Sequence, residues 1–206
     1  MTVKVYVISS DNGISSMFHK AVGFEVTSKV GIADMVVFPG GADINPSMYG
    51  EKAIKETHFI DSVDARDRSV FGLLKPNQLK VGICRGGQFL NVMNGGKMWQ
   101  HVTNHGIRGT HNVIDFRSGE IIPVTSTHHQ MMIMGPGGEL VAAAEGISDT
   151  FKNDQFPEGV PKIGWPEYEP EVIWYNDKRT LCFQPHPEYY NDTTRKYFFD
   201  LLDHVL

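Results

Sequence analysis

Short apolar runs alternate with helical or turn-rich stretches through the first half of the chain. Four runs stand out, at residues 3–8, 24–27, 35–38 and 79–83, and a helical segment at 62–74 precedes the last of them. Uninterrupted apolar runs are typical of strands covered on both faces, and the intervening helices provide that cover. The pattern therefore predicts a mainly parallel central sheet flanked by helices.

In the second half, apolar runs follow one another with little helix between them. They lie at residues 112–116, 121–125, 140–144, 172–175 and 181–183. Strands joined without a helical crossover pair antiparallel, so these runs predict an antiparallel extension of the sheet. A closing helix is expected at 192–206, where Asp192 is a suitable N-cap. The expectation is an α/β fold that forms one domain over residues 1–206.

One acidic stretch, residues 145–177, interrupts this regularity. It contains Pro157, Pro161, Pro166 and Pro170, and prolines break helices and central strands. We therefore expect a long loop or lid at the rim of a site. Its eight acidic residues against two basic ones favour a cationic leaving group or a basic partner surface. A solvated surface excursion is the alternative interpretation.

Composition narrows the classes of protein to consider. The 206 residues carry a formal charge of −5, which gives no basic footprint for nucleic acid, and no apolar run is long enough to span a bilayer. Lys4 interrupts the N-terminal apolar run, which indicates a strand and not a signal peptide. Two cysteines, Cys84 and Cys182, are too few for a disulfide framework. We expect a cytoplasmic protein without nucleic-acid or membrane partners.

The segment VGICRGGQ at 81–88 carries the strongest chemical signal. A strand ends and a helix begins there, with Cys84 at the junction, as in a nucleophile elbow. Gly82 and Gly86 remove side chains that would collide in so tight a turn. The positive end of the following helix lowers a thiol's pKa. We therefore expect Cys84 to be a nucleophile, whereas Cys182 fits a buried structural cysteine.

A base and an orienting acceptor are found together in FQPHPE at 183–188. Each proline biases the residue before it toward an extended conformation, so His186 and Glu188 project to the same side. One nitrogen of His186 can then face Cys84 while Glu188 accepts from the other. Ordinary turn chemistry is the alternative interpretation of this segment taken alone.

Paired glycines follow a buried strand at Gly40 and Gly41. Without a Cβ, their backbone N–H groups are free to approach a ligand. Together with the N–H of Arg85, such a group would make an oxyanion hole.

Five of the nine histidines fall between His101 and His129. His101 and His105 are four residues apart and would share one face of a helix, where they could hold a metal. No carboxylate or cysteine joins them at ligand spacing. We expect no metal site and no cofactor, and assign these histidines to polar surface or loop packing.

Taken together, these segments resemble the class I glutamine amidotransferase superfamily, and most closely its gamma-glutamyl hydrolases of the gamma-glutamyl-GABA hydrolase type. The matching segments are GGADINP at 40–46, YGE at 49–51, DARD at 64–67, GICRGGQ at 82–88, NV at 91–92, GG at 95–96, STHHQ at 126–130 and QPHPE at 184–188. The resemblance covers residues 34–188 in matching order and implies a flavodoxin-like sheet.

The resemblance also implies roles for individual residues. It implies a triad of Cys84, His186 and Glu188 that attacks the delta-carbonyl of a gamma-glutamyl amide, with an oxyanion hole near Gly41 and Arg85. It places Gln88 and the segment His128-His129-Gln130 in the glutamyl pocket. Gln88 as a helix surface residue, and the two histidines as structural groups, are the alternatives. Pro185 replaces the bulky residue often found before the family's catalytic histidine.

Three functions are compatible with these motifs. The first is a stand-alone thiol hydrolase that releases glutamate from a glutamyl thioester. The second is a glutaminase subunit that passes ammonia to a separate synthetase or ligase, because the chain has no ATP-binding Gly-rich loop of its own. The third is a binding module without catalysis, against which the complete triad argues.

Overall fold

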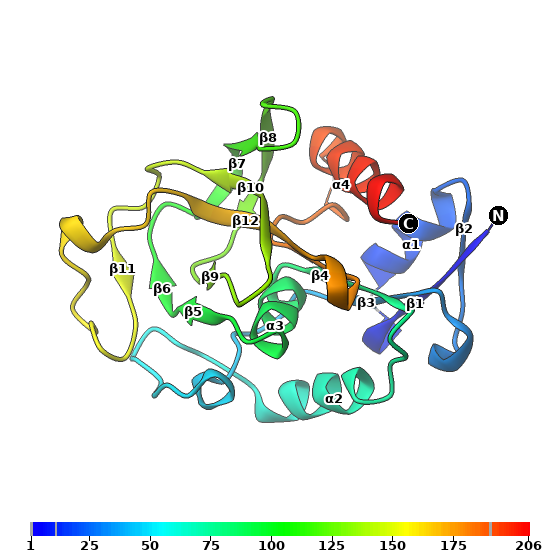
Figure 1. Cartoon of the computed structure of the whole chain (residues 1–206), viewed down its shortest axis with the longest axis horizontal. Helices are drawn as coiled ribbons and strands as arrows, with labels where there is room; N and C mark the ends of the chain where they lie inside the picture. Colours follow the sequence, from blue (N-terminus) through cyan, green and yellow to red (C-terminus); the bar gives the residue numbers. More distant parts are fainter. Residues whose placement is uncertain (1, 11, 190) are drawn as a thin grey trace.

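The computed structural model describes residues 2–10, 12–189 and 191–206. Its centre is a nine-stranded sheet in the order β2-β1-β3-β4-β13-β12-β10-β7-β8 (Figure 1). The strands of this sheet are β1 (Val3–Val7), β2 (Phe24–Val26), β3 (Met35–Phe38), β4 (Leu79–Ile83), β7 (Gly106–Asp115), β8 (Ile121–Thr127), β10 (Glu139–Ala144), β12 (Glu169–Tyr175) and β13 (Thr180–Phe183).

Helices and shorter strands complete the fold. The α-helices are α1 (Asn12–Lys20), α2 (Asp61–Phe71), α3 (Arg85–Met93) and α4 (Asp192–Val205). The short strands β5 (Lys97–Trp99) and β9 (Met131–Ile133) pair with each other, as do β6 (His101–Val102) and β11 (Phe151–Lys152). Single 3₁₀ turns lie at Ile8–Ser10, Val30–Ile32, Pro46–Tyr49, Lys162–Gly164 and Asn176–Lys178.

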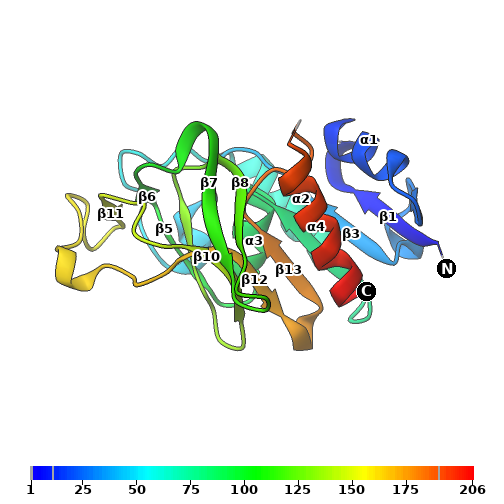
Figure 2. The ribbon, with the colours of Figure 1, turned by 90° about the horizontal axis from the view of Figure 1, so that it is seen from above.

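The sheet changes character at β13. From β2 to β13 every neighbouring pair is parallel, and from β13 to β8 every pair is antiparallel. Figure 2 shows the order from β7 and β8 at one end, past β12 and β13, to β1 at the other. The predicted α/β fold is thus confirmed, with a sheet that is parallel at one end and continues into the expected antiparallel extension.

Each face of the parallel half is covered by a different pair of helices. Along β3, Met35 and Val37 pack in a core with α1 and α4, whereas Val36 and Phe38 pack in a second core with α2 and α3. This alternation follows from the two-residue period of a strand. In Figure 1, α2 and α3 lie below the sheet and α4 above it. Since both faces are buried, the strand is apolar without interruption, as the sequence indicated.

The predicted strand at 172–175 is confirmed, and the overlapping prediction of a long loop over residues 145–177 is wrong at its C-terminal end. Residues 169–175 form the buried strand β12, which lies between β10 and β13. Pro170 is accommodated because its partner, Ala143, lies at a register shift of β10, and a bulge tolerates a residue that lacks an N–H group. The remainder, 145–168, contains β11 and packs on residues 52–56 through Asp154 and Lys152.

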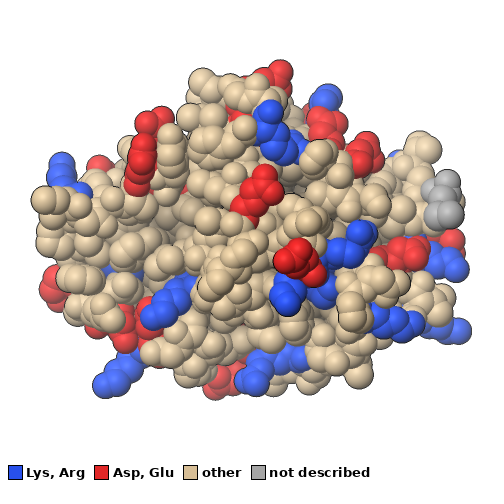
Figure 3. Space-filling view, in the orientation of Figure 1, with Lys and Arg blue, Asp and Glu red and all other residues tan. Residues whose placement is uncertain are grey.

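Two surface properties follow from the side chains. On the face drawn in Figure 3, acidic and basic residues are interspersed. Within the described residues, no helix is both long and apolar enough to cross a membrane.

Candidate active site

Cys84 lies at the sharp turn between β4 and α3. Its backbone has φ 51° and ψ −115°, a conformation that is unfavourable for any residue with a Cβ and that is characteristic of nucleophile elbows. A Cβ at Gly82 would overlap the carbonyl group of Gly86, and one at Gly86 would overlap the carbonyl oxygen of Phe38. Both glycines are therefore required by the close approach of the turn to its own helix and to β3.

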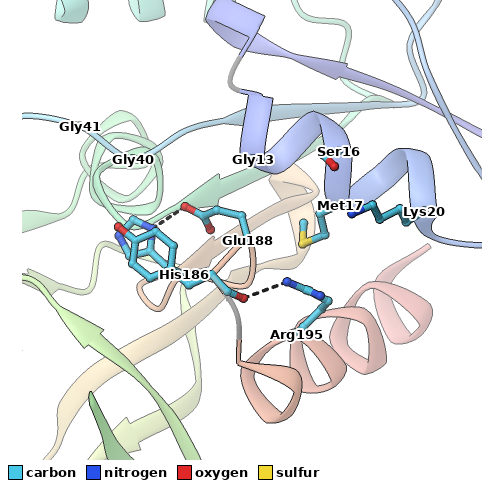
Figure 4. A pocket seen from close by; sticks show the side chains of 10 residues that line it. Gly13, Ser16, Met17, Lys20, Gly40, Gly41, His186, Glu188 and Arg195 are labelled. Carbon is cyan, nitrogen blue, oxygen red and sulfur yellow. Dashed lines mark hydrogen bonds and ion pairs between the residues drawn. The ribbon is translucent and has the colours of Figure 1, made fainter. Parts of the chain in front are cut away.

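His186 and Glu188 form a hydrogen-bonded pair beside this turn. The distance between His186 Nδ1 and Glu188 Oε1 is 2.6 Å, as Figure 4 shows by a dashed line. The ring of Tyr189 stacks on the imidazole with 4.3 Å between centroids. On the backbone side, the His186 N–H donates to Thr125 Oγ1 at 2.7 Å. The stacking on Tyr189, the hydrogen bond to Glu188 and the backbone hydrogen bond to Thr125 together fix the position of the imidazole.

Gly40 brings the proposed nucleophile and base into one place. A Cβ on Gly40 would lie 2.9 Å from Cε1 of His186 and 3.7 Å from Cβ of Cys84. Burial by itself lowers the pKa of His186, but its hydrogen bonds and charge interactions with Cys84 and Glu188 outweigh this and raise the pKa to about 11. The arrangement therefore favours an imidazolium at His186.

The paired glycines lie next to the first residue of α3. A Cβ at Gly41 would be 3.5 Å from Cδ of Arg85. The Arg85 side chain is buried, and its guanidinium pairs with both Asp64 and Asp67 of α2. Asp64 also accepts from the N–H of Asn45 at 3.0 Å. Through these two aspartates, helix α2 joins the start of α3 to the loop after β3 that contains Gly40 and Gly41 (the glycine loop). The motif DARD did not by itself reveal this positioning role.

A cavity of about 590 Å³ opens on the His186 side of the glycines. Figure 4 shows that α1 and α4 form its far wall. Its lining consists of Gly13, Ser16, Met17, Lys20, Gly40, Gly41, His186, Glu188, Tyr189 and Arg195. Tyr189 was not expected from the sequence, because an aromatic residue after a turn carries no distinguishing signal. None of these residues comes from 145–177.

Gln88 lies inside the protein and not on a helix surface. Its Nε2 is 3.2 Å from Oε1 of Gln184 and 3.4 Å from the carbonyl oxygen of Gln130. Gln184 in turn directs its Nε2 at Sγ of Cys84, 3.6 Å away. A chain of amides therefore leads from Gln130 to the sulfur, and Gln184 is a further member that was not expected from the sequence.

The neighbours His128 and His129 point to different places. His129 is 39% exposed at its side chain, and its Nε2 is 3.0 Å from Oδ1 of Asp43, close to the glycine loop. The Asp43 hydrogen bond raises the pKa of His129. His128 is buried, and its ring nitrogens contact the carbonyl of Gln130 and the carboxylate of Glu171. The two histidines diverge where the chain leaves β8 after Thr127 and bends at His129.

His101 and His105 do not share a helix face. His101 is in β6 and approaches His129, whereas His105 precedes β7 and is buried against Glu169 and Glu171. Burial lowers the pKa of His105, but these two carboxylates outweigh it and raise the pKa to about 9. The spacing of residues in the sequence could not predict these carboxylate partners of His105, because the two glutamates are more than sixty residues away in the chain.

The fold and the sequence both have known counterparts. The Peptidase C26 family model matches residues 17–152. The putative glutamine amidotransferase-like protein YvdE of Lactococcus lactis subsp. lactis is 30% identical over 167 residues, which are 69% of this chain and 68% of that protein. The putative glutamine amidotransferase PB2B2.05 of Schizosaccharomyces pombe is 37% identical over 83 residues, 38% of this chain and 32% of that protein.

Solved structures show the same fold at low sequence identity. A putative GMP synthase component of Thermoplasma acidophilum aligns with a TM-score of 0.65 and 15% identity, over 100% of this chain and 94% of that one. A glutamine amidotransferase of Thermotoga maritima aligns with a TM-score of 0.57 and 16% identity, over 100% and 84%. With the family match and the relatives, the chain belongs to the Peptidase C26 family, within the class I glutamine amidotransferase superfamily.

Proposed function

We propose that the protein is a cysteine-dependent hydrolase that cleaves the gamma-glutamyl amide bond of glutamine or of a gamma-glutamyl conjugate. Family membership and the named relatives support the broader role of a cysteine-type amidase or glutaminase. The observation that carries the proposal is the juxtaposition, around Gly40, of Cys84 on its strained turn with the hydrogen-bonded pair of His186 and Glu188.

In the first step the Cys84 thiolate attacks the delta-carbonyl carbon and forms a C–S bond. The negative charge moves to the carbonyl oxygen, which the N–H groups of Gly41 and Arg85 stabilise as an oxyanion hole. Gly40 leaves room for this geometry beside the imidazole. His186 then gives its proton to the departing amine as the C–N bond breaks. A neutral amine leaves, and a glutamyl thioester remains on Cys84.

In the second step water attacks the thioester. His186, now neutral, accepts a proton from the water, and Glu188 stabilises the imidazolium that forms. Collapse of the tetrahedral intermediate breaks the C–S bond and releases glutamate. The sulfur leaves as a thiolate opposite the imidazolium, which is the starting state. Glu188 orients the ring throughout and does not transfer a proton itself.

The two ends of the substrate would lie on different sides of the sulfur. In this proposal Gln88, His129 and Gln130 hold the glutamyl end, with His128 supporting them from the buried side. The leaving amine would enter the cavity walled by α1 and α4. At about 590 Å³, this cavity lies within the range of small-molecule sites and offers more room than ammonia needs, which favours a conjugate over glutamine.

A glutaminase subunit that supplies ammonia to a separate synthetase or ligase is the second candidate. It is favoured by two structural neighbours, the putative GMP synthase component named above and PurLQS of Thermotoga maritima, which aligns with a TM-score of 0.62 at 16% identity over 100% of both chains.

One experiment separates these functions. The free protein is assayed for glutamate release from glutamine and from a series of gamma-glutamyl amines, with Cys84→Ala as the blank. The proposal requires partner-free turnover that is faster on at least one conjugate than on glutamine. Near silence on every substrate, relieved by an added synthetase, would instead establish the glutaminase that works within a larger complex.

A further inference from the structure

Five buried ionisable side chains converge at the antiparallel end of the sheet, outside the proposed triad. They come from four places in the chain: His105 just before β7, His111 within β7, His128 just after β8, and Glu169 and Glu171 in β12. All five are at most 8% exposed. Three histidine nitrogens, Nδ1 of His105, Nε2 of His111 and Nε2 of His128, each lie 3.2 Å from the same oxygen, Oε1 of Glu171.

Hydrogen bonds on the outer side of the cluster determine which nitrogen of each ring faces Glu171. His128 Nδ1 is 2.8 Å from the carbonyl oxygen of Gln130. Because a carbonyl only accepts, this nitrogen carries the hydrogen, and a neutral ring then turns the lone pair of Nε2 toward Glu171. In the same way, His105 uses Nε2 on the carboxylate of Glu169 and turns Nδ1 toward Glu171. Lone pairs of nitrogen and oxygen can therefore face one another across the cluster.

Several of these atoms lack a hydrogen-bond partner within the part of the chain that the structure describes. They are Nδ1 of His105, both ring nitrogens of His111 and Oε2 of Glu171. Over the same residues, the ion pairs of Glu169 and Glu171 are all with histidines. Two buried carboxylates need matching positive charge.

We propose that this cluster is a zinc site, in which His105, His128 and Glu171 bind Zn²⁺ and His111, whose Nε2 lies beside Glu171, moves in as the fourth donor when the ion binds. Four ligands about 2.0–2.1 Å from a tetrahedral ion lie about 3.3 Å apart, which agrees with the 3.2 Å contacts to Glu171. The donor atoms of His105, His128 and Glu171 all lie within 4.8 Å of one another. Two positive charges would balance the two carboxylates.

The donor set and the surrounding contacts select the kind of ion and its role. Imidazole nitrogens suit zinc and other late transition metals, whereas magnesium and calcium take oxygen ligands. Glu169 and the carbonyl of Gln130 orient two of the rings in the manner of an outer ligand shell. Since every ligand is buried, the site has the closed form of a structural zinc centre.

A metal here would hold the amide chain of the proposed active site. The Gln184 N–H donates to the carbonyl of Glu171 at 2.8 Å, and the carbonyl of Gln130 contacts both His128 and Gln88. Hydrogen bonds thus connect the proposed ligands Glu171 and His128 to Gln184 and Gln88. Gln184 in turn contacts the sulfur of Cys84. The site would join β12 to the ends of β7 and β8, where the sheet has no α-helical crossover.

The test is a Co²⁺ titration of the full-length protein after treatment with a chelator. We expect one equivalent of Co²⁺ per chain, with the visible absorption of a tetrahedral nitrogen and oxygen site, and a rise in the thermal unfolding midpoint when Zn²⁺ replaces it. Glu171→Gln should abolish the absorption, and Glu169→Gln should weaken binding by about 10–100-fold because it only orients His105. The control His19→Gln, an exposed histidine on α1, should bind like the wild type.

Metal binding by a thiol is excluded by repeating the titration in Cys84→Ser, which should retain the band. Loss of the band in Cys84→Ser, or its persistence in Glu171→Gln, would overturn the proposal. So would a wild-type protein that takes up no stoichiometric Co²⁺, in which case protons hold the cluster together. This last result comes from the wild type and is decisive even if Glu171→Gln fails to fold.

Discussion

The parallel half of the sheet and its antiparallel extension gather reactive groups by different means. In the parallel half, Cys84, Gly82 and Gly86 are within five residues of one another, and the turn that exposes the thiol is built by that segment and its immediate neighbours. In the extension, His111 and Glu171 are sixty residues apart and meet only because β7 and β12 converge on the same interior. Local backbone strain makes the first site, and long-range convergence makes the second.

In the proposed mechanism, the two halves of the sheet have different roles. The parallel half would carry the covalent chemistry, whereas the extension would hold the segments that bind substrate and position the base. Thr125, which belongs to β8, illustrates the connection because its hydroxyl accepts the N–H of His186.

The largest expected effect tests whether the covalent chemistry belongs to the parallel half. Cys84→Ala should lower turnover by about 10⁴-fold or more without loss of the fold. Cys182→Ala should stay near wild type, because Cys182 is fully buried in β13 and its burial raises the pKa of the thiol. Peptide mapping after reaction with a diazo-ketone glutamine analogue should find the label on Cys84. A label on Cys182 would contradict the assignment.

The second prediction grades the other two members of the triad. His186→Ala should lose about 10²–10⁴-fold in kcat, as expected for a general acid and base, and Glu188→Gln should lose less. Because Glu188 contributes to the raised pKa of His186, Glu188→Gln should move the alkaline limb of kcat/KM to lower pH. Equal losses in the two variants, with both folded, would mean that Glu188 has a different role.

The raised pKa of His186 also sets the sign of a stability effect. The folded-state pKa of His186 is about 11, above the ordinary histidine pKa of about 6.5. Protonation of His186 therefore contributes its full stabilisation of the fold at pH values below the ordinary pKa. This contribution is lost as pH rises through the folded value. Urea unfolding should therefore show the wild type losing more stability than His186→Ala between neutral and strongly alkaline pH.

A third change breaks the close packing of the elbow. In Gly86→Ala the new methyl would meet the carbonyl of Phe38, so we expect a loss of about 3 kcal/mol in the free energy of unfolding. Gly31→Ala is the matched control because no atom lies within 4 Å of the position that its methyl group would take, and its backbone is not left-handed. Urea denaturation measures the free energy of unfolding of both variants. Equal values would show that β3 shifts to accommodate the new methyl group.

A smaller effect is expected from the extension. Thr125→Val removes the hydroxyl that accepts from the His186 N–H and leaves that buried donor unpaired, at a cost of about 1–3 kcal/mol. We expect kcat/KM to fall by about tenfold, with rescue by Thr125→Ser. Failure of the serine variant to restore activity would show that packing at Thr125 matters and the hydroxyl does not.

The smallest effect is expected from the acidic segment. Because β12 begins at Glu169, a Gly/Ser linker should replace only residues 153–168. As a lid, this segment would affect discrimination among leaving amines and leave the labelling of Cys84 unchanged. Unchanged kinetics on every substrate would make it a solvated surface excursion.

Features that depend on neighbouring residues could be predicted from the amino-acid sequence alone. They include the doubly buried strands β3 and β4, the elbow at Cys84 and the pairing of His186 with Glu188, although Pro187 and Glu188 lie in a turn and not in an extended segment. The conformation of Cys84 agrees with that prediction.

Contacts between distant segments emerged only from the folded arrangement. Pro170 indicated a loop, yet it lies in a strand because a register shift in its neighbour removes the need for its N–H. His128 and His129 could not be separated by sequence, and the partners of His105 could not be found at all, because Glu169 and Glu171 approach it from another strand. A local pattern specifies which face a residue takes, but which groups share that face depends on how the strands are ordered in the sheet.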